Sequence, residues 1–179
     1  MGYMCLKYIY LLYIVLLQIP FFNDKNIASV AAGTLHSLCL DITGRNLYSF
    51  GSHGDGQLGV SRDPIDADHC ETSPIPVYLN HGDTATDNKV KRNPIIRSIS
   101  CGDKTSMAVT ESGHLYTWGK GEQSALGHGT CDDCFLPKKV KVEKVIMASG
   151  GGEHNMVITE TGRDIGNQPR KGSYVAPAD

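Results

Sequence analysis

The chain has 179 residues, which is enough for one domain with a buried core. Its formal net charge of −2 argues against a dedicated nucleic-acid binder, because such domains are usually basic over their whole surface. The 20 glycines exceed an average composition and indicate many tight turns, which favours short strands over long helices. Nucleic acid is therefore not expected as a partner.

The first 22 residues are hydrophobic and differ from the rest of the chain. The stretch from Tyr8 to Phe22 carries no charge. It is shorter than the ~20 residues of a membrane helix but fits a signal-peptide core of ~7–15 residues. Three interpretations of residues 1–22 stay open: a signal peptide or membrane anchor, a strand that belongs to an upstream unit of the fold, or non-native sequence from a wrong gene start. A membrane is expected as a partner only under the first.

One glycine-containing motif occurs three times, as Ile27–Gly33, Ile96–Gly102 and Val145–Gly151. Each copy has an aliphatic residue followed by small residues and a closing glycine. A second glycine follows at the same spacing of eleven positions in all three copies (33 to 44, 102 to 113 and 151 to 162). Such a constant register indicates an internal structural repeat.

Each repeat predicts an antiparallel hairpin. Leu38 and Leu40 alternate with smaller residues, which is the period-2 pattern of a strand. Thr43-Gly44 and Ser112-Gly113 stand where a tight turn needs a positive φ. An aromatic strand then returns, Leu47–Gly51 in the first copy and Leu115–Gly119 in the second. Because a single hairpin would leave these aromatic side chains in water, neighbouring copies are expected to pack on one another.

Two copies continue further, through Gly54–Gly59 and Glu122–Gly127, and each closes with a proline and a valine, in Pro74–Val77 and Pro137–Val140. This order of motifs resembles the repeat of the regulator of chromosome condensation (RCC1) family. The resemblance covers residues 27–162. It implies an all-β fold, a β-propeller in which each repeat contributes a four-stranded blade.

Two full copies and the start of a third predict an incomplete propeller, with repeats at 27–77, 96–140 and 145–162. The resemblance assigns structural roles to the motif positions, which are Gly33, His36, Gly44, Gly51, Gly59, Gly102, Gly113, Trp118, Gly119, Gly127, Gly151, His154 and Gly162. The second copy departs from the family at Thr105, where a histidine is expected, and at Gln123–Ala125, where the family has Gly-Gln.

An insertion at 62–91 lengthens the first repeat and is rich in Asp, His and Asn. We expect it to be a flexible loop at a blade edge. Because loops on a rigid scaffold commonly carry binding, it is also the expected contact surface. Residues 163–179 are polar, contain Pro and Gly and show no period, so a disordered tail is expected there.

No catalytic constellation is apparent, and the chain is not expected to be an enzyme. His36 and His154 have no nucleophile or acid in register with both, so hydrogen-bonded structural histidines are expected. Cys39 and Cys101 occupy repeat positions that hold alanine in another copy, which predicts buried small residues. His128, Cys131 and Cys134 have the spacing of metal ligands and form the candidate metal site, although a second cysteine pair is absent. No cofactor is expected.

The sequence predicts a non-enzymatic scaffold that binds another protein through its blade-edge loops. For a full-length parent, the resemblance implies two alternatives: guanine-nucleotide exchange on the small GTPase Ran, or the RCC1 part of a ubiquitin ligase. Cysteines that occur as lone small residues suit a reducing compartment, so a cytoplasmic or nuclear location is expected. The secretory pathway or a membrane is the alternative if residues 1–22 are a signal or anchor.

Overall fold

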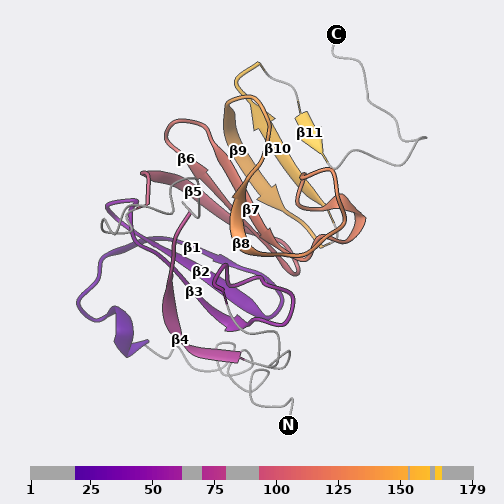
Figure 1. Ribbon diagram of the computed structural model, residues 1–179. Coiled ribbons are helices and arrows are strands. Elements are labelled where there is room, and N and C mark those ends of the chain that lie inside the picture. Colours follow the sequence, from indigo (N-terminus) through magenta and orange to yellow (C-terminus); the bar gives the residue numbers. More distant parts are fainter. Residues whose placement is uncertain (1–18, 62–69, 80–92, 153, 162–163, 167–179) are drawn as a thin grey trace, which may run out of the picture.

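The computed structural model describes residues 19–61, 70–79, 93–152, 154–161 and 164–166. These residues form three antiparallel sheets that follow one another in chain order (Figure 1). The first sheet contains β1 (Ile27–Ala32), β2 (His36–Asp41), β3 (Leu47–Ser52) and β4 (Cys70–Val77). The second contains β5 (Ile96–Cys101), β6 (Thr105–Thr110), β7 (Leu115–Gly119) and β8 (Cys134–Lys139). The third contains β9 (Val145–Gly150), β10 (Asn155–Thr159) and β11 (Asp164–Gly166).

The predicted hairpins are confirmed. Strands β2 and β3 pair so that Leu38 lies opposite Ser49 and Leu40 opposite Leu47. The turn glycines have the expected backbone, with φ of +69° at Gly44 and +81° at Gly113. These left-handed conformations strain any residue with a Cβ, which is why glycine ends both β-turns.

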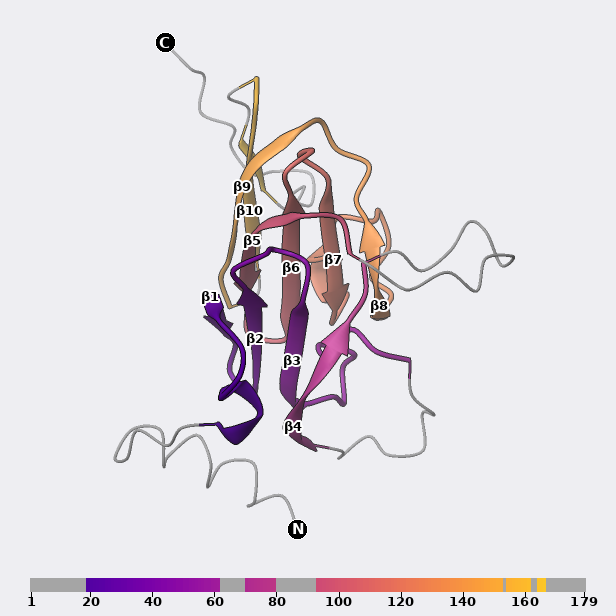
Figure 2. The same ribbon diagram turned by 90° about the vertical axis from the view of Figure 1, so that its left-hand side faces the viewer.

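The first strand of each sheet carries a bulge at the same repeat position. The register shifts between Ile27 and Ser29 in β1 and between Ile96 and Ser98 in β5, and β9 shifts against β10 at the corresponding place. Strands β1, β5 and β9 are neighbours in space (Figures 1 and 2). Bulges increase local twist, so this recurring bulge bends the three neighbouring strands in the same way.

The core lies between the sheets. One cluster joins the first and second sheets, with Leu38 and Leu47 on one side and Tyr116 and Trp118 on the other. A second cluster joins the second and third sheets, with Met107 and Val109 packed with Val157. The aromatic strand of the second copy is therefore covered by the first copy, as the repeat predicts. The architecture is an all-β, incomplete propeller.

Two predicted irregular segments contain strands. The insertion expected as one loop at 62–91 is divided by β4 (Cys70–Val77), and its parts at 62–69 and 80–91 lie outside the described residues. The segment 163–179, expected to be disordered, contains β11 (Asp164–Gly166), which pairs with β10. The rest of that segment, and Gly162, are also outside the described residues.

The hydrophobic N-terminal segment ends in a short 3-10 helix, Pro20–Phe22, rather than in a strand. The three interpretations of residues 1–22 stay predictions, because residues 1–18 lie outside the described chain. Among the helices that the structure describes, none combines the length and apolar character needed to cross a membrane.

Candidate protein-binding face

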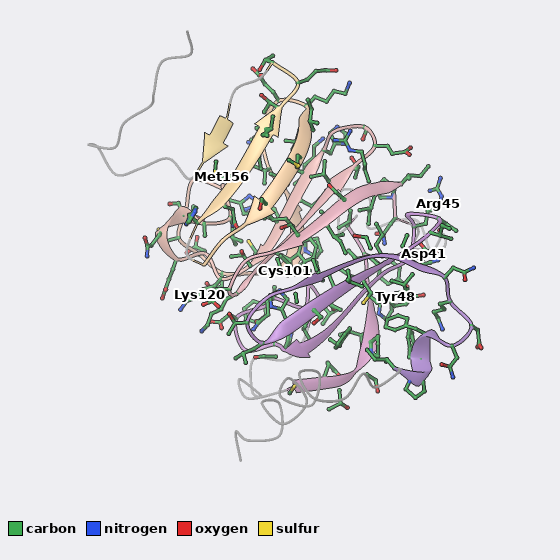
Figure 3. All side chains as sticks on the ribbon, turned by 180° about the vertical axis from the view of Figure 1, so that it is seen from behind. Asp41, Arg45, Tyr48, Cys101, Lys120 and Met156 are labelled. Carbon is green, nitrogen blue, oxygen red and sulfur yellow. The ribbon has the colours of Figure 1, made fainter. Side chains whose placement is uncertain are left out.

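Several connections between strands gather at one end of the sheets. They comprise residues 33–35, 53–61, 102–104 and 120–133, which we call the loop face. The topology places them together, because β1 and β3 run toward this end and β2 runs away from it. Figure 3 shows Lys120 at this end and Asp41 and Arg45 at the opposite one. The loop face contains the described parts of the long connections between the third and fourth strands, residues 53–61 and 120–133.

The loop face begins beyond a glycine that is the last residue but one of β3 and the last residue of β7. Gly119 has a φ of +104°, and a Cβ there would lie 2.3 Å from the carbonyl oxygen of Lys104. This close approach lets the Lys120 amide donate to the Lys104 oxygen at 3.0 Å. Gly51 has a φ of +109° and brings the Ser52 amide to the Leu35 oxygen at 2.7 Å. The long loops are thereby joined to the short turns beside them.

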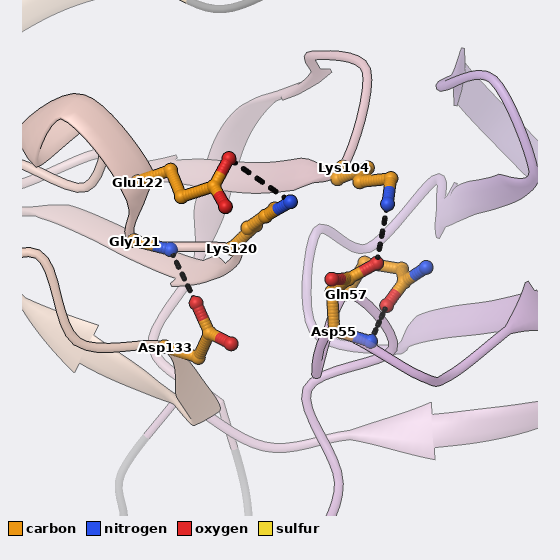
Figure 4. Close-up of polar contacts among 7 residues, drawn as sticks. All are labelled: Asp55, Gln57, Lys104, Lys120, Gly121, Glu122 and Asp133. Carbon is orange, nitrogen blue, oxygen red and sulfur yellow. Dashed lines mark hydrogen bonds and ion pairs between the residues drawn. The ribbon is translucent and has the colours of Figure 1, made fainter. Parts of the chain in front are cut away.

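Paired charges cover the loop face (Figure 4). The Lys104 ammonium lies 3.0 Å from the Asp55 carboxylate and so connects the second repeat to the first. Lys120 lies 3.0 Å from Glu122, and the hydrogen bond to Glu122 raises the pKa of Lys120. The Gly121 amide donates to Asp133 at 2.8 Å. Exposed pairs of this kind contribute little stability, so their charges are available to a partner.

A buried polar layer supports the loop face between the first and second sheets. The Ser106 hydroxyl and the Trp118 indole N–H both donate to the Gln57 carbonyl, at 2.8 and 3.0 Å. His36 Nε2 lies 2.8 Å from the Ser106 oxygen. Because the single hydroxyl hydrogen of Ser106 is directed at the Gln57 backbone oxygen, His36 donates to Ser106 through Nε2. Burial lowers the pKa of His36 to about 4.

The same layer recurs between the second and third sheets with different residues. Asn155 donates to the Ala125 carbonyl at 2.9 Å, as Ser106 does to Gln57. The amide of Asn155 also lies 3.3 Å from the Thr105 hydroxyl, and Thr105 occupies the position of His36. Ser106 and Asn155 are not among the site residues predicted from the sequence. The available signal was a polar residue directly after the motif histidine position in every copy.

The departure from Gly-Gln in the second repeat changes the backbone of the loop face. Gln123 and Ser124 adopt φ values of +53° and +60°. Gly56 holds the position of Ser124 in the first repeat and has a φ of +81°. The second repeat therefore keeps the loop shape with side chains that disfavour it, at a cost of roughly 1–2 kcal/mol for each non-glycine residue.

The candidate metal ligands make separate contacts. His128 Nε2 lies 3.0 Å from the Thr117 hydroxyl, and the exposed Cys131 sulfur lies 3.6 Å from the Ser124 hydroxyl. Cys134 packs against the core cluster of the first two sheets, and burial raises its pKa. Within the described part of the chain, no three His, Cys, Asp or Glu side chains are grouped as a metal site.

The other cysteines in the described part of the chain are of two kinds. Cys39 and Cys101 are buried free thiols, and burial raises their pKa values to about 11 and 12. Thiols with such high pKa values are poor nucleophiles. Cys70, by contrast, is disulfide-bonded, a state that reducing compartments disfavour.

The other motif residues occupy the ends of strands and turns. Trp118 is fully buried, and a Cβ at Gly59 would lie 2.7 Å from its indole nitrogen. A Cβ at Gly33 would lie 2.3 Å from the His36 ring, so this glycine makes room for the histidine. His154 is exposed, unlike His36. The motif glycines that stand at positive φ are Gly44, Gly51, Gly59, Gly113, Gly119 and Gly127. The glycines at the turns before the second strands are Gly33, Gly102 and Gly151.

Repeated antiparallel sheets that share polar and apolar layers define a repeat protein of the β-propeller class. The family model of the regulator of chromosome condensation (RCC1) repeat matches residues 46–109 and 112–158, and a second model of this repeat matches residues 96–124. The chain therefore belongs to the RCC1 repeat family.

Known relatives span several kinds of protein. The chain is 29% identical to the ultraviolet-B receptor UVR8 of Arabidopsis thaliana, over 81% of the chain and 30% of the receptor. It is 27% identical to the human regulator of chromosome condensation, over 77% of the chain and 30% of that protein. It is 33% identical to the human E3 ubiquitin-protein ligase HERC2, over 84% of the chain and 3% of the ligase.

The solved structures agree with the sheet arrangement. Prp20p of Saccharomyces cerevisiae superposes with a TM-score of 0.62 and 28% identity, covering 79% of this chain and 32% of Prp20p. That structure was described together with the binding of Prp20p to Gsp1p and histones. The chain thus spans about a third or less of the length of each protein it matches here.

Proposed function

We propose that the chain is a non-enzymatic RCC1-repeat scaffold that binds another protein through its loop face. The observation that carries the proposal is the ion pair between Lys104 and Asp55, which joins loops of two repeats on one surface. Lys120, Glu122 and Asp133 extend this surface with charges of both signs. A surface with such mixed charge selects its partner by electrostatic complementarity.

The support beneath the loop face favours binding with little rearrangement. The Gln57 carbonyl accepts from both Ser106 and Trp118, so the loop around Gln57 is held by the second sheet. A surface whose loops are already ordered loses little conformational entropy when a partner docks. The contact surface predicted from the sequence was the insertion at 62–91, most of which lies outside the described residues. The loop face is a second blade-edge surface, and the positions of its side chains are described.

Quantitative affinity purification of the tagged chain tests the proposal. Lys104→Glu together with Lys120→Glu reverses two charges on the loop face. Lys139→Glu together with Lys141→Glu makes the same net change at exposed positions at the opposite end of the second sheet. We expect the loop-face variant to lose its specific partners at least tenfold and the control variant to retain them.

Equal retention by both variants would overturn the proposal, provided that both proteins are folded. Circular dichroism and thermal melting check the fold. The Lys104–Asp55 pair is partly exposed, so its loss is expected to cost less than about 1 kcal/mol. A change in binding without a change in melting temperature then reports on the surface itself.

Guanine-nucleotide exchange on a Ran-type GTPase is the second candidate. It is favoured by the likeness to Prp20p, which was described with its binding to Gsp1p. The assay is release of a fluorescent GDP analogue from a purified Ran-type GTPase when the chain is added. Acceleration of release would support exchange, whereas binding without acceleration would support the scaffold.

The ubiquitin-ligase alternative concerns a longer parent protein. Because the chain aligns with 3% of HERC2, the ligase activity of that relative is not transferred to this chain. We place the scaffold in the cytoplasm or nucleus, where the free thiols of Cys39 and Cys101 persist. The disulfide of Cys70 in the structure argues for the secretory alternative, and that alternative would be favoured if protein isolated from cells under thiol-blocking conditions keeps this disulfide.

A further inference from the structure

The outward face of the first sheet repeats a surface that is buried elsewhere in the molecule. Val30, Cys39 and Tyr48 are directly paired across strands β1, β2 and β3, so they share one face. The corresponding residues of the second sheet are Ile99, Ala108 and Tyr116, which are likewise paired across strands. Those three belong to the core cluster between the first and second sheets. The repeat thus uses this face to receive a neighbouring sheet.

In the first sheet, a segment of the same chain lies on part of this face. The rings of Phe21 and Phe22 pack edge-on against Tyr48, with centroids 5.2 and 5.7 Å away. Within the segment, Lys25 donates to the Phe21 carbonyl at 2.8 Å and lies 4.1 Å from the Phe21 ring, so it orders the turn that presents this ring to Tyr48. The Asn26 carbonyl accepts from the Ile42 amide at 2.8 Å. We call residues 20–25 the cap.

The cap covers the face incompletely. Tyr48 is half-buried, whereas Val30 on the same face is 71% exposed. Phe21 itself remains 36% exposed. A neighbouring sheet would cover Val30, Cys39 and Tyr48 together, as the first sheet covers the corresponding residues of the second. Because burial of apolar area is the main favourable term in association, a sheet can compete with this small cap.

The third sheet presents the surface that would fit. Met156 and Ile158 occupy the repeat positions of Leu38 and Leu40, which cover the second sheet. Met147 lies opposite Ile158 on the same face. These three side chains are 50%, 38% and 52% exposed. Figure 3 shows Met156 on the third sheet and Tyr48 on the first, at the two ends of the row of sheets.

We propose that the cap is displaceable, and that its removal lets the third sheet of a second copy pack on the first sheet. The contact continues the packing already seen between the first and second sheets, with methionine side chains that adapt readily to a partner surface. The two surfaces differ and lie at opposite ends of the row. The interface is therefore head-to-tail, and it adds copies until a ring closes.

Sedimentation velocity of the 179-residue chain tests this proposal over a range of concentrations. The wild-type chain is expected to sediment as a monomer, and Phe21→Ala with Phe22→Ala to show a sedimentation coefficient that rises with concentration. Ile42→Ala is the matched control, because Ile42 is an exposed apolar residue in the turn after β2 and its contact with the segment before β1 is made by its backbone amide, which the substitution keeps. It is expected to behave as wild type.

Blocking variants in the cap-less background test which surfaces meet. Val30→Lys blocks the first sheet and Met156→Lys blocks the third, so each alone is expected to restore the monomer. A mixture of these two proteins retains one complementary pair of surfaces and is expected to form dimers but nothing larger. Formation of dimers only in the mixture distinguishes a head-to-tail contact from non-specific association of the apolar face that is exposed when the cap is removed.

A folded cap-less variant that stays monomeric would overturn the proposal, as would association unaffected by Val30→Lys and Met156→Lys. If removal of both phenylalanines prevents folding, Lys25→Ala decides the outcome. It removes the contacts of Lys25 but keeps both rings, and it is expected to promote association that a peptide of residues 19–26 reverses. Monomeric Lys25→Ala would then overturn the proposal.

Discussion

The stability of the first interface between sheets should depend on pH through His36. Its burial lowers the pKa to about 4, whereas the same side chain in the unfolded chain titrates near 6.5. Between pH 6.5 and pH 4, His36 is therefore protonated in the unfolded state but not in the folded state. The free energy of unfolding falls as the pH falls through this range. The full effect is about 3 kcal/mol, of which about 2 kcal/mol is lost between pH 8 and pH 5.

Urea denaturation at pH 8 and pH 5 measures this loss, with the fluorescence of the single tryptophan, Trp118, as the probe. His36→Gln is the comparison, because its amide N–H can donate to Ser106 and does not titrate. We expect the wild type to lose about 2 kcal/mol more than His36→Gln between the two pH values. An equal loss in the two proteins would refute the assignment of His36 as a neutral donor in the buried layer.

Three further predictions concern the second repeat. Ser124→Gly should raise the free energy of unfolding by about 1 kcal/mol, because it relieves a left-handed backbone; no gain on thermal denaturation would contradict this. Trp118→Phe should lower stability by about 2 kcal/mol by urea denaturation followed by circular dichroism, through loss of the bond to Gln57 and of ring volume. EDTA should leave unchanged the melting temperatures of the wild type and of Cys131→Ser with Cys134→Ser, and a chelator-sensitive wild type would contradict the separate contacts of these residues.

The architecture could be predicted from the sequence because the same motif occurs in three copies. The positions of Leu38, Gly44 and Trp118 relative to the repeat glycines determine strand, turn and return strand, and the structure places them accordingly. The sequence was less informative at the edges of the repeats. The proline-valine end of β4 matches that of β8, but the start of β4 lies within a stretch that was predicted to be a loop. Strand β11 lies in a polar segment that shows no strand periodicity.

The candidate site was harder to predict because its contacts cross repeats. Lys104 and Asp55 are far apart in the sequence and in different repeats, so no local pattern links them. His36 was expected to be structural, and it donates to Ser106 within the buried polar layer. The sequences around the other members of this layer, Ser106 and Gln57, carry no local motif that predicts their contact. His154 has the same local sequence context but is exposed. The environment of a motif residue thus depends on the sheet that packs against it.

The most direct test of the central claim is hydrogen–deuterium exchange of the chain with and without the partner retained in affinity purification. Binding through the loop face predicts slowed exchange in residues 53–61 and 120–133, with little change in the turns 42–46 and 111–114 at the opposite end. Protection confined to those opposite turns, or absent from both loop-face segments, would contradict the account.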